Sequence, residues 1–117
     1  MHIVETWAEN ATDEYLEWFG KQTAESKEVL LAKVLLFEEF EPQLGRPHGD
    51  TLKGSRIKNL KELRAKTSSH VLRVLYYFDD ERQALLLVGE DKKGKNEKHF
   101  YKNLIQSAEI LIERYRP

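Results

Sequence analysis

The pattern of hydrophobic positions predicts a short strand and then a helix at the start of the chain. Residues 2–7 (HIVETW) alternate enough to predict a short strand, with Ile3 and Trp7 on one side and Val4 on the other. Tyr15, Trp18 and Phe19 then recur at the three- and four-residue spacing of one helix face. An aromatic stripe at this spacing is typical of a core, so we expect these rings to be buried rather than to bind a ligand.

A second and clearer helix is predicted over Glu25–Phe40. The first helix can be capped by Asn10 or Thr12. Two helices joined by a few residues predict an antiparallel helical hairpin on one face of a sheet. Val29–Leu36 carries apolar side chains nearly all round, so we expect part of this surface to be covered by a partner chain or by the closing helix and the sheet.

A basic strand is predicted over Ile57–Arg64, although its alternation is imperfect. A period of two places Leu60, Glu62 and Arg64 on one face of this strand. The residues expected on the opposite face are Ile57, Lys61 and Leu63.

Two further strands are predicted over His70–Phe78 and Ala84–Val88, which are rich in β-branched, aromatic and aliphatic residues. The intervening segment FDDERQA contains turn-forming acids, so an antiparallel hairpin is expected. Arg73 is the only charged residue between Val71 and Phe78. A lone arginine among aliphatic residues on a sheet indicates a functional role, and the alternative is an arginine that only pairs with Glu62.

The chain is then expected to form a polar loop over Gly89–His99 and an amphipathic helix over Phe100–Tyr115. The predicted fold class is α+β: a small twisted antiparallel sheet with an N-terminal helical hairpin on one face and a closing C-terminal helix. The length of 117 residues predicts a single domain, residues 1–117.

The composition indicates the cellular compartment in which the protein is expected. The chain has no cysteine, which excludes disulfides, thiolate metal ligands and a cysteine nucleophile. Its first residues lack a signal-peptide pattern, and no apolar run reaches the length of a membrane span. We therefore expect a cytoplasmic protein with no membrane partner.

Charge is distributed unevenly along the chain. Residues 1–41 hold ten acidic and three basic side chains, and residues 42–117 hold ten acidic and sixteen basic ones. The acidic half is either a set of solvated helix faces or one end of a bipolar molecule. The glycine-containing, basic segment Gly45–Arg64 indicates a surface that faces an anion, and nucleic acid is the expected anion.

Several motifs together resemble a known family. They are LGRPHGDTLKGSRIKNLKELR, the arginine-bearing strand HVLRVLYYF, FDDERQALLLVGEDKKGK and the closing KHFYKNLI. This combination resembles the HigB-like, phage-derived branch of the RelE/ParE toxin superfamily of type II toxin–antitoxin systems. The resemblance implies a twisted antiparallel sheet with a helical hairpin on one face and a site on an open concave face.

The resemblance also implies an activity and partners. It implies a ribosome-dependent messenger-RNA endonuclease, an mRNA interferase that inhibits translation and is held inactive in a complex with a cognate antitoxin. The expected partners are thus the antitoxin, the ribosome and messenger RNA. The alternatives are a ParE-like toxin that inhibits DNA gyrase by protein binding and a phage protein that binds RNA without catalysis.

Metal-free RNA cleavage by a 2'-hydroxyl needs proton transfer and charge stabilisation at the phosphorane, and arginine suits the second task. Arg73 is the strongest catalytic candidate, and Arg64 resembles the arginine of the family's ELR motif. Glu62 is expected to orient an arginine or to act as a base. These three residues are the core of the predicted site.

The remaining candidates surround this core. Lys93, His99 and Tyr101 are predicted to assist catalysis. For each lysine of the loop, the alternative interpretation is a solvated side chain without a role in catalysis. No cofactor or metal is expected, because the four histidines are dispersed. The predicted RNA-binding residues are Lys53, Arg56, Lys58, Lys92 and Lys95.

Overall fold

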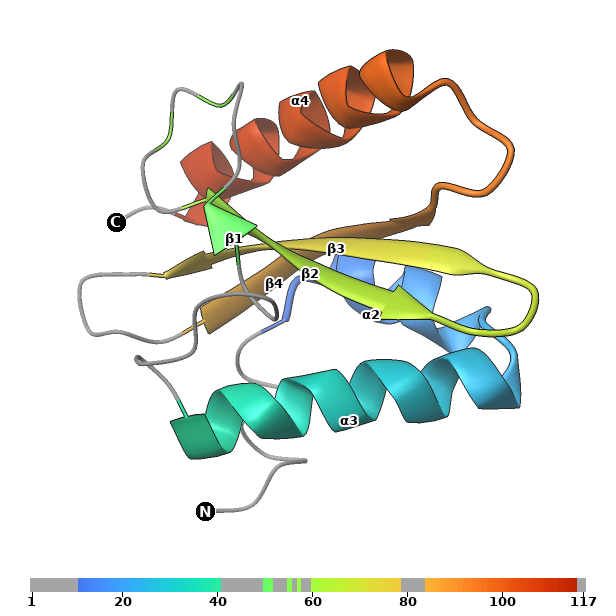
Figure 1. Ribbon diagram of the computed structural model, residues 1–117. Coiled ribbons are helices and arrows are strands. Elements are labelled where there is room, and N and C mark those ends of the chain that lie inside the picture. Colours follow the sequence, from blue (N-terminus) through green and yellow to red (C-terminus); the bar gives the residue numbers. More distant parts are fainter. Residues whose placement is uncertain are drawn as a thin grey trace.

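The computed structural model describes residues 11–40, 50–51, 55, 57, 60–78 and 84–115, and the predicted strand at residues 2–7 lies outside them. A four-stranded sheet lies between helices on its two faces (Figure 1). This α+β arrangement confirms the predicted fold class. The elements are α2 (Asp13–Gly20), α3 (Ala24–Phe40), β1 (Asp50–Thr51), β2 (Leu60–Lys66), β3 (Val71–Phe78), β4 (Ala84–Asp91) and α4 (Glu97–Tyr115).

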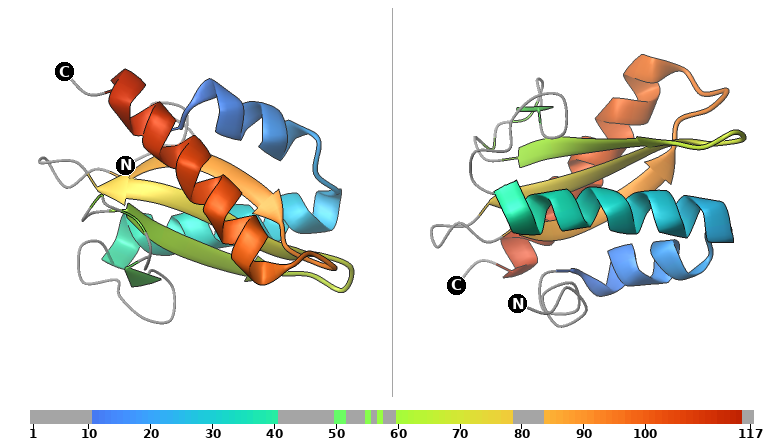
Figure 2. Two further views of the ribbon diagram at one scale, coloured as in Figure 1. Left: turned by 90° about the horizontal axis from the view of Figure 1, so that it is seen from above. Right: turned by 60° about the horizontal axis from the view of Figure 1, so that its bottom comes forward.

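The helical hairpin of α2 and α3 covers one face of the sheet, and Figure 2 shows the two helices beside each other there. Thr12 caps α2, because its hydroxyl accepts a hydrogen bond from the Tyr15 amide at 3.0 Å and donates one to the Leu87 carbonyl at 2.6 Å. The predicted burial of the aromatic stripe is confirmed, since Tyr15 is fully buried and Trp18 and Phe19 pack against it. The buried core on this face consists of Tyr15, Leu30, Val34, Leu63, Ala65, Leu72, Val74, Tyr76 and Leu86.

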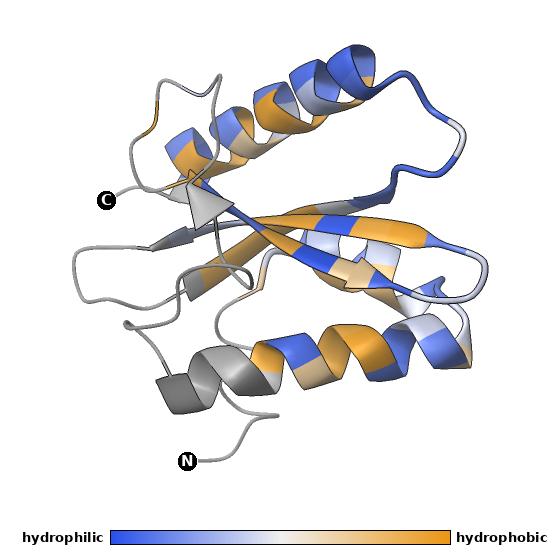
Figure 3. Cartoon of the chain, viewed as in Figure 1, coloured by the Kyte–Doolittle hydropathy of each residue, from blue (hydrophilic) through white to orange (hydrophobic). Residues whose placement is uncertain are grey.

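Helix α4 crosses the opposite face of the sheet, with its apolar side turned toward the strands (Figure 3). In the part of the chain that the structure describes, no helix combines the length and the apolar content needed to cross a membrane. The buried core beneath α4 consists of Leu60, Leu75, Leu87, Phe100, Leu104, Ile105, Ala108, Leu111 and Ile112.

The four strands are antiparallel and follow one another in the order of the sequence. The pairing of β3 with β4 shifts between Leu75 and Tyr76, whose partners are Val88 and Leu86. Leu87 is therefore an extra residue in β4, as in a β-bulge. Its carbonyl is the group that Thr12 binds, so the bulge is also the point at which α2 is attached to the sheet.

The first basic strand begins later than predicted. Strand β2 starts at Leu60 and not at Ile57, because the Ser55 hydroxyl accepts a hydrogen bond from the Ile57 amide and the Ile57 carbonyl accepts one from Leu60. These contacts form a turn before the strand. The segment predicted as a loop also contains a strand, since Asp50–Thr51 pairs with β2.

The predicted loop Gly89–His99 is shorter in the structure. Strand β4 continues to Asp91, because Glu90 and Asp91 still pair with β3. Helix α4 begins at Glu97, three residues before the predicted start, because the side chain of Asn96 accepts a hydrogen bond from the His99 amide and caps it. The loop therefore consists of residues 92–96.

The apolar surface of α3 is not covered by the closing helix. Leu30 and Val34 face the sheet, whereas α4 lies on the other side of it. Leu31 is 39% exposed. The proposed burial of this surface by α4 was therefore wrong for the residues whose side chains are described, and coverage by a partner chain stays a prediction.

Candidate functional site

The candidate site begins with two arginines that face each other across two strands. Arg64 of β2 is paired with Arg73 of β3 in the antiparallel register, so their side chains leave the sheet on the same face. The Arg64 side chain is 55% exposed, and the Arg73 side chain is 11% exposed. Like charges placed directly opposite each other destabilise a sheet unless a counter-charge lies nearby.

Glu62 supplies that counter-charge. It precedes Arg64 by two residues on β2 and thus points to the same face, as the period of two along the strand predicted. Its Oε1 accepts a hydrogen bond from Arg64 Nε at 2.8 Å, and its Oε2 lies 3.8 Å from Arg73 Nε. The carboxylate is 3% exposed, and among the described residues its Oε2 has no hydrogen-bond partner.

Tyr101 reaches the same cluster from the first turns of α4. Its hydroxyl accepts a hydrogen bond from Arg73 Nε at 3.1 Å, while Arg73 Nη1 donates to the carbonyl of Leu72 at 3.0 Å. Burial raises the pKa of Tyr101, and the Glu62 carboxylate adds to the rise while Arg73 opposes it. The phenol therefore stays protonated at neutral pH, between the Arg73 guanidinium and the Glu62 carboxylate.

A lysine closes the cluster from the loop. Lys92 Nζ lies 5.8 Å from the centre of the Tyr101 ring, a cation–π geometry, and donates a hydrogen bond to Glu97 Oε1 at 2.7 Å. The hydrogen bond from Lys92 is the largest cause of the lowered pKa of Glu97. The positive charges of Arg73 and Arg64 lower that pKa further.

A contact between Asp91 and His70 fixes the loop that carries Lys92. Asp91 Oδ2 lies 2.6 Å from His70 Nδ1, and its Oδ1 accepts hydrogen bonds from the amides of Val71 and Lys93, each at 3.0 Å. Burial alone would raise the pKa of Asp91, but the hydrogen bonds from His70 and the two amides outweigh it and lower the pKa. The end of β4 is thereby held against the start of β3, next to the cluster.

Three predicted residues lie apart from the contacts of the cluster. Lys93 contributes its amide to Asp91 and its side chain is exposed, so it is Lys92 that stands over Tyr101. His99 is exposed and its amide completes the cap of α4. Lys95 lies 3.6 Å from Glu90 and above the ring of Phe100.

The other predicted RNA-binding residues, Lys53, Arg56 and Lys58, lie outside the described residues. The described residues contain no group of three or more histidines, aspartates and glutamates arranged to hold a metal ion. The structure thus brings together four of the six predicted catalytic residues: Arg73, Arg64, Glu62 and Tyr101.

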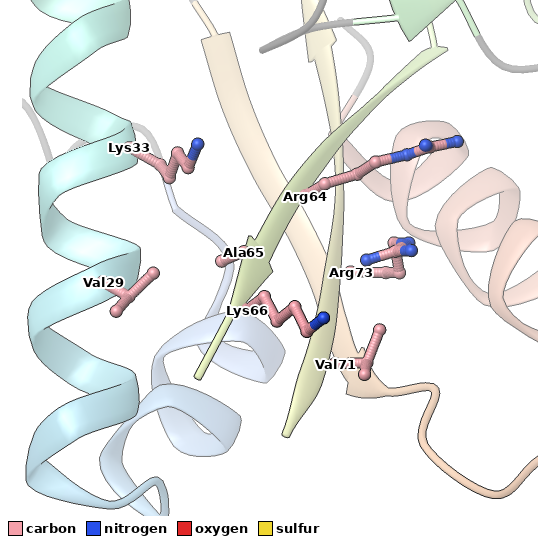
Figure 4. A pocket seen from close by; sticks show the side chains of 7 residues that line it. All are labelled: Val29, Lys33, Arg64, Ala65, Lys66, Val71 and Arg73. Carbon is pink, nitrogen blue, oxygen red and sulfur yellow. The ribbon is translucent and has the colours of Figure 1, made fainter. Parts of the chain in front are cut away.

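A groove of about 480 Å³ extends from this cluster around the edge of β2 (Figure 4). Arg64 and Arg73 line one side of it, and Lys33 of α3 lies on the other side of the strand. Its complete lining is Val29, Lys33, Arg64, Ala65, Lys66, Val71 and Arg73, which includes four basic side chains and no acidic one.

Sequence reasoning missed three residues that the structure places at the site or its groove. Lys66 continues the alternation of Glu62 and Arg64, so a longer predicted strand would have included it. Neither Lys33 nor Glu97 carries a comparable signal, because each belongs to a helix whose docking on the sheet decides what it meets.

The fold and the cluster describe an α+β protein that carries a cationic cluster on one face of its sheet. The cluster lies beneath the start of the closing helix α4. Residues 17–113 match the model of the family described as "Phage derived protein Gp49-like", and the chain belongs to that family. This membership confirms the resemblance to the phage-derived, HigB-like branch that the motifs indicated.

Two relatives from Mycobacterium tuberculosis are similar over most of this chain. The protein named "Putative toxin HigB3" is 39% identical over 98 residues, which are 84% of this chain and 83% of that protein. The protein named "Putative toxin HigB2" is 34% identical over 97 residues, which are 82% of this chain. Those residues are 48% of that protein, so the chain spans about half its length. No solved structure matches the chain significantly.

Proposed function

We propose that this protein is the toxin of a type II toxin–antitoxin module and cleaves messenger RNA on the ribosome. Its partners in this proposal are a cognate antitoxin, the ribosome and messenger RNA. The observation that carries the proposal is the cluster in which Glu62 lies between two opposed arginines and Tyr101 closes over Arg73. The names of the two relatives support the toxin assignment.

The reaction that suits this cluster is attack by a ribose 2'-oxygen on the adjacent phosphorus. The new bond joins the 2'-oxygen to phosphorus, the bond from phosphorus to the 5'-oxygen breaks, and the products are a 2',3'-cyclic phosphate and a 5'-hydroxyl. The 2'-hydroxyl loses a proton and the leaving 5'-oxygen gains one. The phosphorane between these states carries excess negative charge, which preorganised cations stabilise.

Each residue of the cluster has a role in this proposal. Arg64 is 55% exposed and meets the phosphate first, while Arg73 is buried and held rigidly, so it stabilises the phosphorane. Glu62 is 3% exposed and positions both arginines, and acting as the base for the 2'-hydroxyl is the second role open to it. Tyr101, kept protonated by its raised pKa, donates a hydrogen bond or proton to the leaving oxygen.

The proposal is tested in a cell-free translation reaction. The purified protein is added, and the ends of a defined messenger RNA are mapped by primer extension, with a ribosome-free reaction alongside. We expect discrete cuts that need ribosomes and that fall by about 100-fold or more when Arg73→Ala removes one preorganised donor of charge stabilisation.

Arg114→Ala is the matched control. This arginine is 56% exposed and pairs with Glu14, which joins α4 to α2 and involves no residue of the cluster. The control variant should cleave as the wild type does, and circular dichroism should show that both variants are folded. Message that stays intact with the wild-type protein would contradict the proposal and lead to gyrase supercoiling assays.

A further inference from the structure

A carboxylate is bound to the lysine that stands over Tyr101. Lys92 belongs to the loop between β4 and α4, yet its side chain is only 22% exposed. Its Nζ lies over the ring of Tyr101 and donates a hydrogen bond to Glu97 Oε1 at 2.7 Å. Glu97 is the first residue of α4, and its side chain is 68% exposed. The pair therefore joins a cation that is mostly buried to an anion that can turn into solvent.

The backbone of the loop holds Lys92 in place. Its amide donates a hydrogen bond to the Val71 carbonyl at 2.7 Å, and its carbonyl accepts one from the Lys95 amide at 3.1 Å. The second bond closes a turn in which Gly94 has a φ of 75°, a backbone conformation that favours glycine. The position of the ammonium group over Tyr101 is thus set by the turn and the ring, and not by its acidic partner alone.

The Glu97 carboxylate makes the kind of contact that a phosphate of RNA makes. A lysine ammonium group donates to carboxylate and phosphate oxygens alike. The pKa of Glu97 is lowered first by the hydrogen bond from Lys92 and then, to a smaller extent, by the two arginines of the candidate site. Glu90, which the register places opposite Arg73, pairs instead with Lys95 at 3.6 Å. Glu97 is therefore the acid that competes with a phosphate for Lys92.

We infer that Glu97 occupies the place of an RNA phosphate at Lys92 and is displaced when RNA binds, an inference that rests on the proposed function. The phosphate then accepts the hydrogen bond from Lys92, and the carboxylate turns into solvent. Because one ionic contact is lost for the one that is gained, RNA obtains little affinity from Lys92.

This exchange makes Glu97 a specificity-determining residue. It weakens the binding of strands that are held by charge alone, since such strands must displace the carboxylate. A strand that the ribosome already holds in position meets the same competitor at a high effective concentration, so it still enters the site.

The test measures the binding of a short fluorescein-labelled single-stranded RNA to the full chain by fluorescence anisotropy, without ribosomes and over a series of salt concentrations. Glu97→Gln keeps the size of the side chain and removes its charge. We expect this variant to bind the RNA about fivefold more tightly, because Lys92 no longer exchanges one anion for another. The slope of log affinity against log salt concentration should steepen by roughly 0.7, the value for one additional counterion released from a single strand.

Two variants separate this exchange from a general effect of charge. Glu17→Gln removes the acid of an exposed pair on α2, in which Lys21 Nζ lies 3.2 Å from Glu17 Oε1, and should change RNA binding by less than about twofold. Lys92→Met keeps an apolar stem over Tyr101 and removes the charge. In the Lys92→Met background, Glu97→Gln should no longer steepen the salt dependence. Circular dichroism checks that every variant is folded, and inorganic phosphate is the second probe.

Three results would overturn the inference. Unchanged or weaker RNA binding by Glu97→Gln would show that the carboxylate does not compete with RNA. An equal effect of Glu97→Gln in the Lys92→Met background would show a general effect of charge. Tighter binding of inorganic phosphate with unchanged binding of RNA would assign the place to a free phosphate.

These results are independent of cleavage. A wild-type protein that leaves messenger RNA intact in the translation reaction refutes the proposed function, whereas the comparison of RNA affinities decides the role of Glu97.

Discussion

The position of Glu62 between two arginines makes a quantitative prediction about stability. The substitution Glu62→Ala leaves the Arg73 side chain, which is 11% exposed, directly opposite Arg64 without its buried counter-charge. Removing one partner of a buried ion pair costs about 3–5 kcal/mol in unfolding free energy. The pair with Arg64 adds less than about 1 kcal/mol, because that side chain is 55% exposed and screened by solvent.

Two contacts that persist reduce this cost. Arg73 keeps its hydrogen bonds to Tyr101 and to the Leu72 carbonyl. We therefore expect Glu62→Ala to lower the free energy of unfolding by about 3 kcal/mol. At about 4 °C per kcal/mol for a domain of this size, Tm falls by roughly 12 °C.

A double-mutant cycle tests the cause of the loss. In Arg73→Ala, Glu62 keeps its hydrogen bond to Arg64 and the like-charge repulsion disappears, so a smaller loss of about 1–2 kcal/mol is expected. The double variant should be no less stable than Glu62→Ala alone. Urea denaturation followed by circular dichroism measures all four proteins.

The control for this cycle is Glu17→Ala, which removes an exposed glutamate paired with Lys21 on α2. Its effect should stay within about 0.5 kcal/mol. If the losses from Glu62→Ala and Arg73→Ala add to within about 0.5 kcal/mol in the double variant, the two residues are not coupled and the reasoning fails.

Two further predictions concern the support of the site. A methyl group at Gly89 would lie 2.5 Å from Cε3 of Trp18, so Gly89→Ala should destabilise the protein by about 1–3 kcal/mol. Thermal melts should show a smaller loss when Trp18→Leu is also present, and an equal loss in both backgrounds would contradict the overlap. The lowered pKa of Asp91 means that its stabilising effect is present above its ordinary pKa of 3.8 and is lost as pH falls below that value through the lowered pKa. Urea denaturation at a series of pH values should therefore show a stability gap between wild type and Asp91→Asn at pH 6 that shrinks below about pH 4, and a constant gap would exclude this explanation.

The sequence by itself determined those features that arise within a single helix or strand. The period of two placed Glu62 and Arg64 on one face of a strand, although the turn at Ser55 moved the start of that strand. The threonine cap and the aromatic stripe of α2 were also predictable, since capping and helix periodicity act within a few residues. Arg73 was identifiable because a charge among aliphatic residues stands out without any knowledge of its neighbours.

The tertiary structure alone decided which of these residues meet. The pairing of Arg64 with Arg73 depends on the register between β2 and β3, and a shift by one residue would turn one of them to the other face. The choice of Lys92 over Lys93 depends on where β4 ends, and the arrival of Tyr101 and Lys33 depends on how α4 and α3 dock on the two faces. Periodicity specifies a face within an element, whereas register and docking are set by packing between residues that are distant in the sequence.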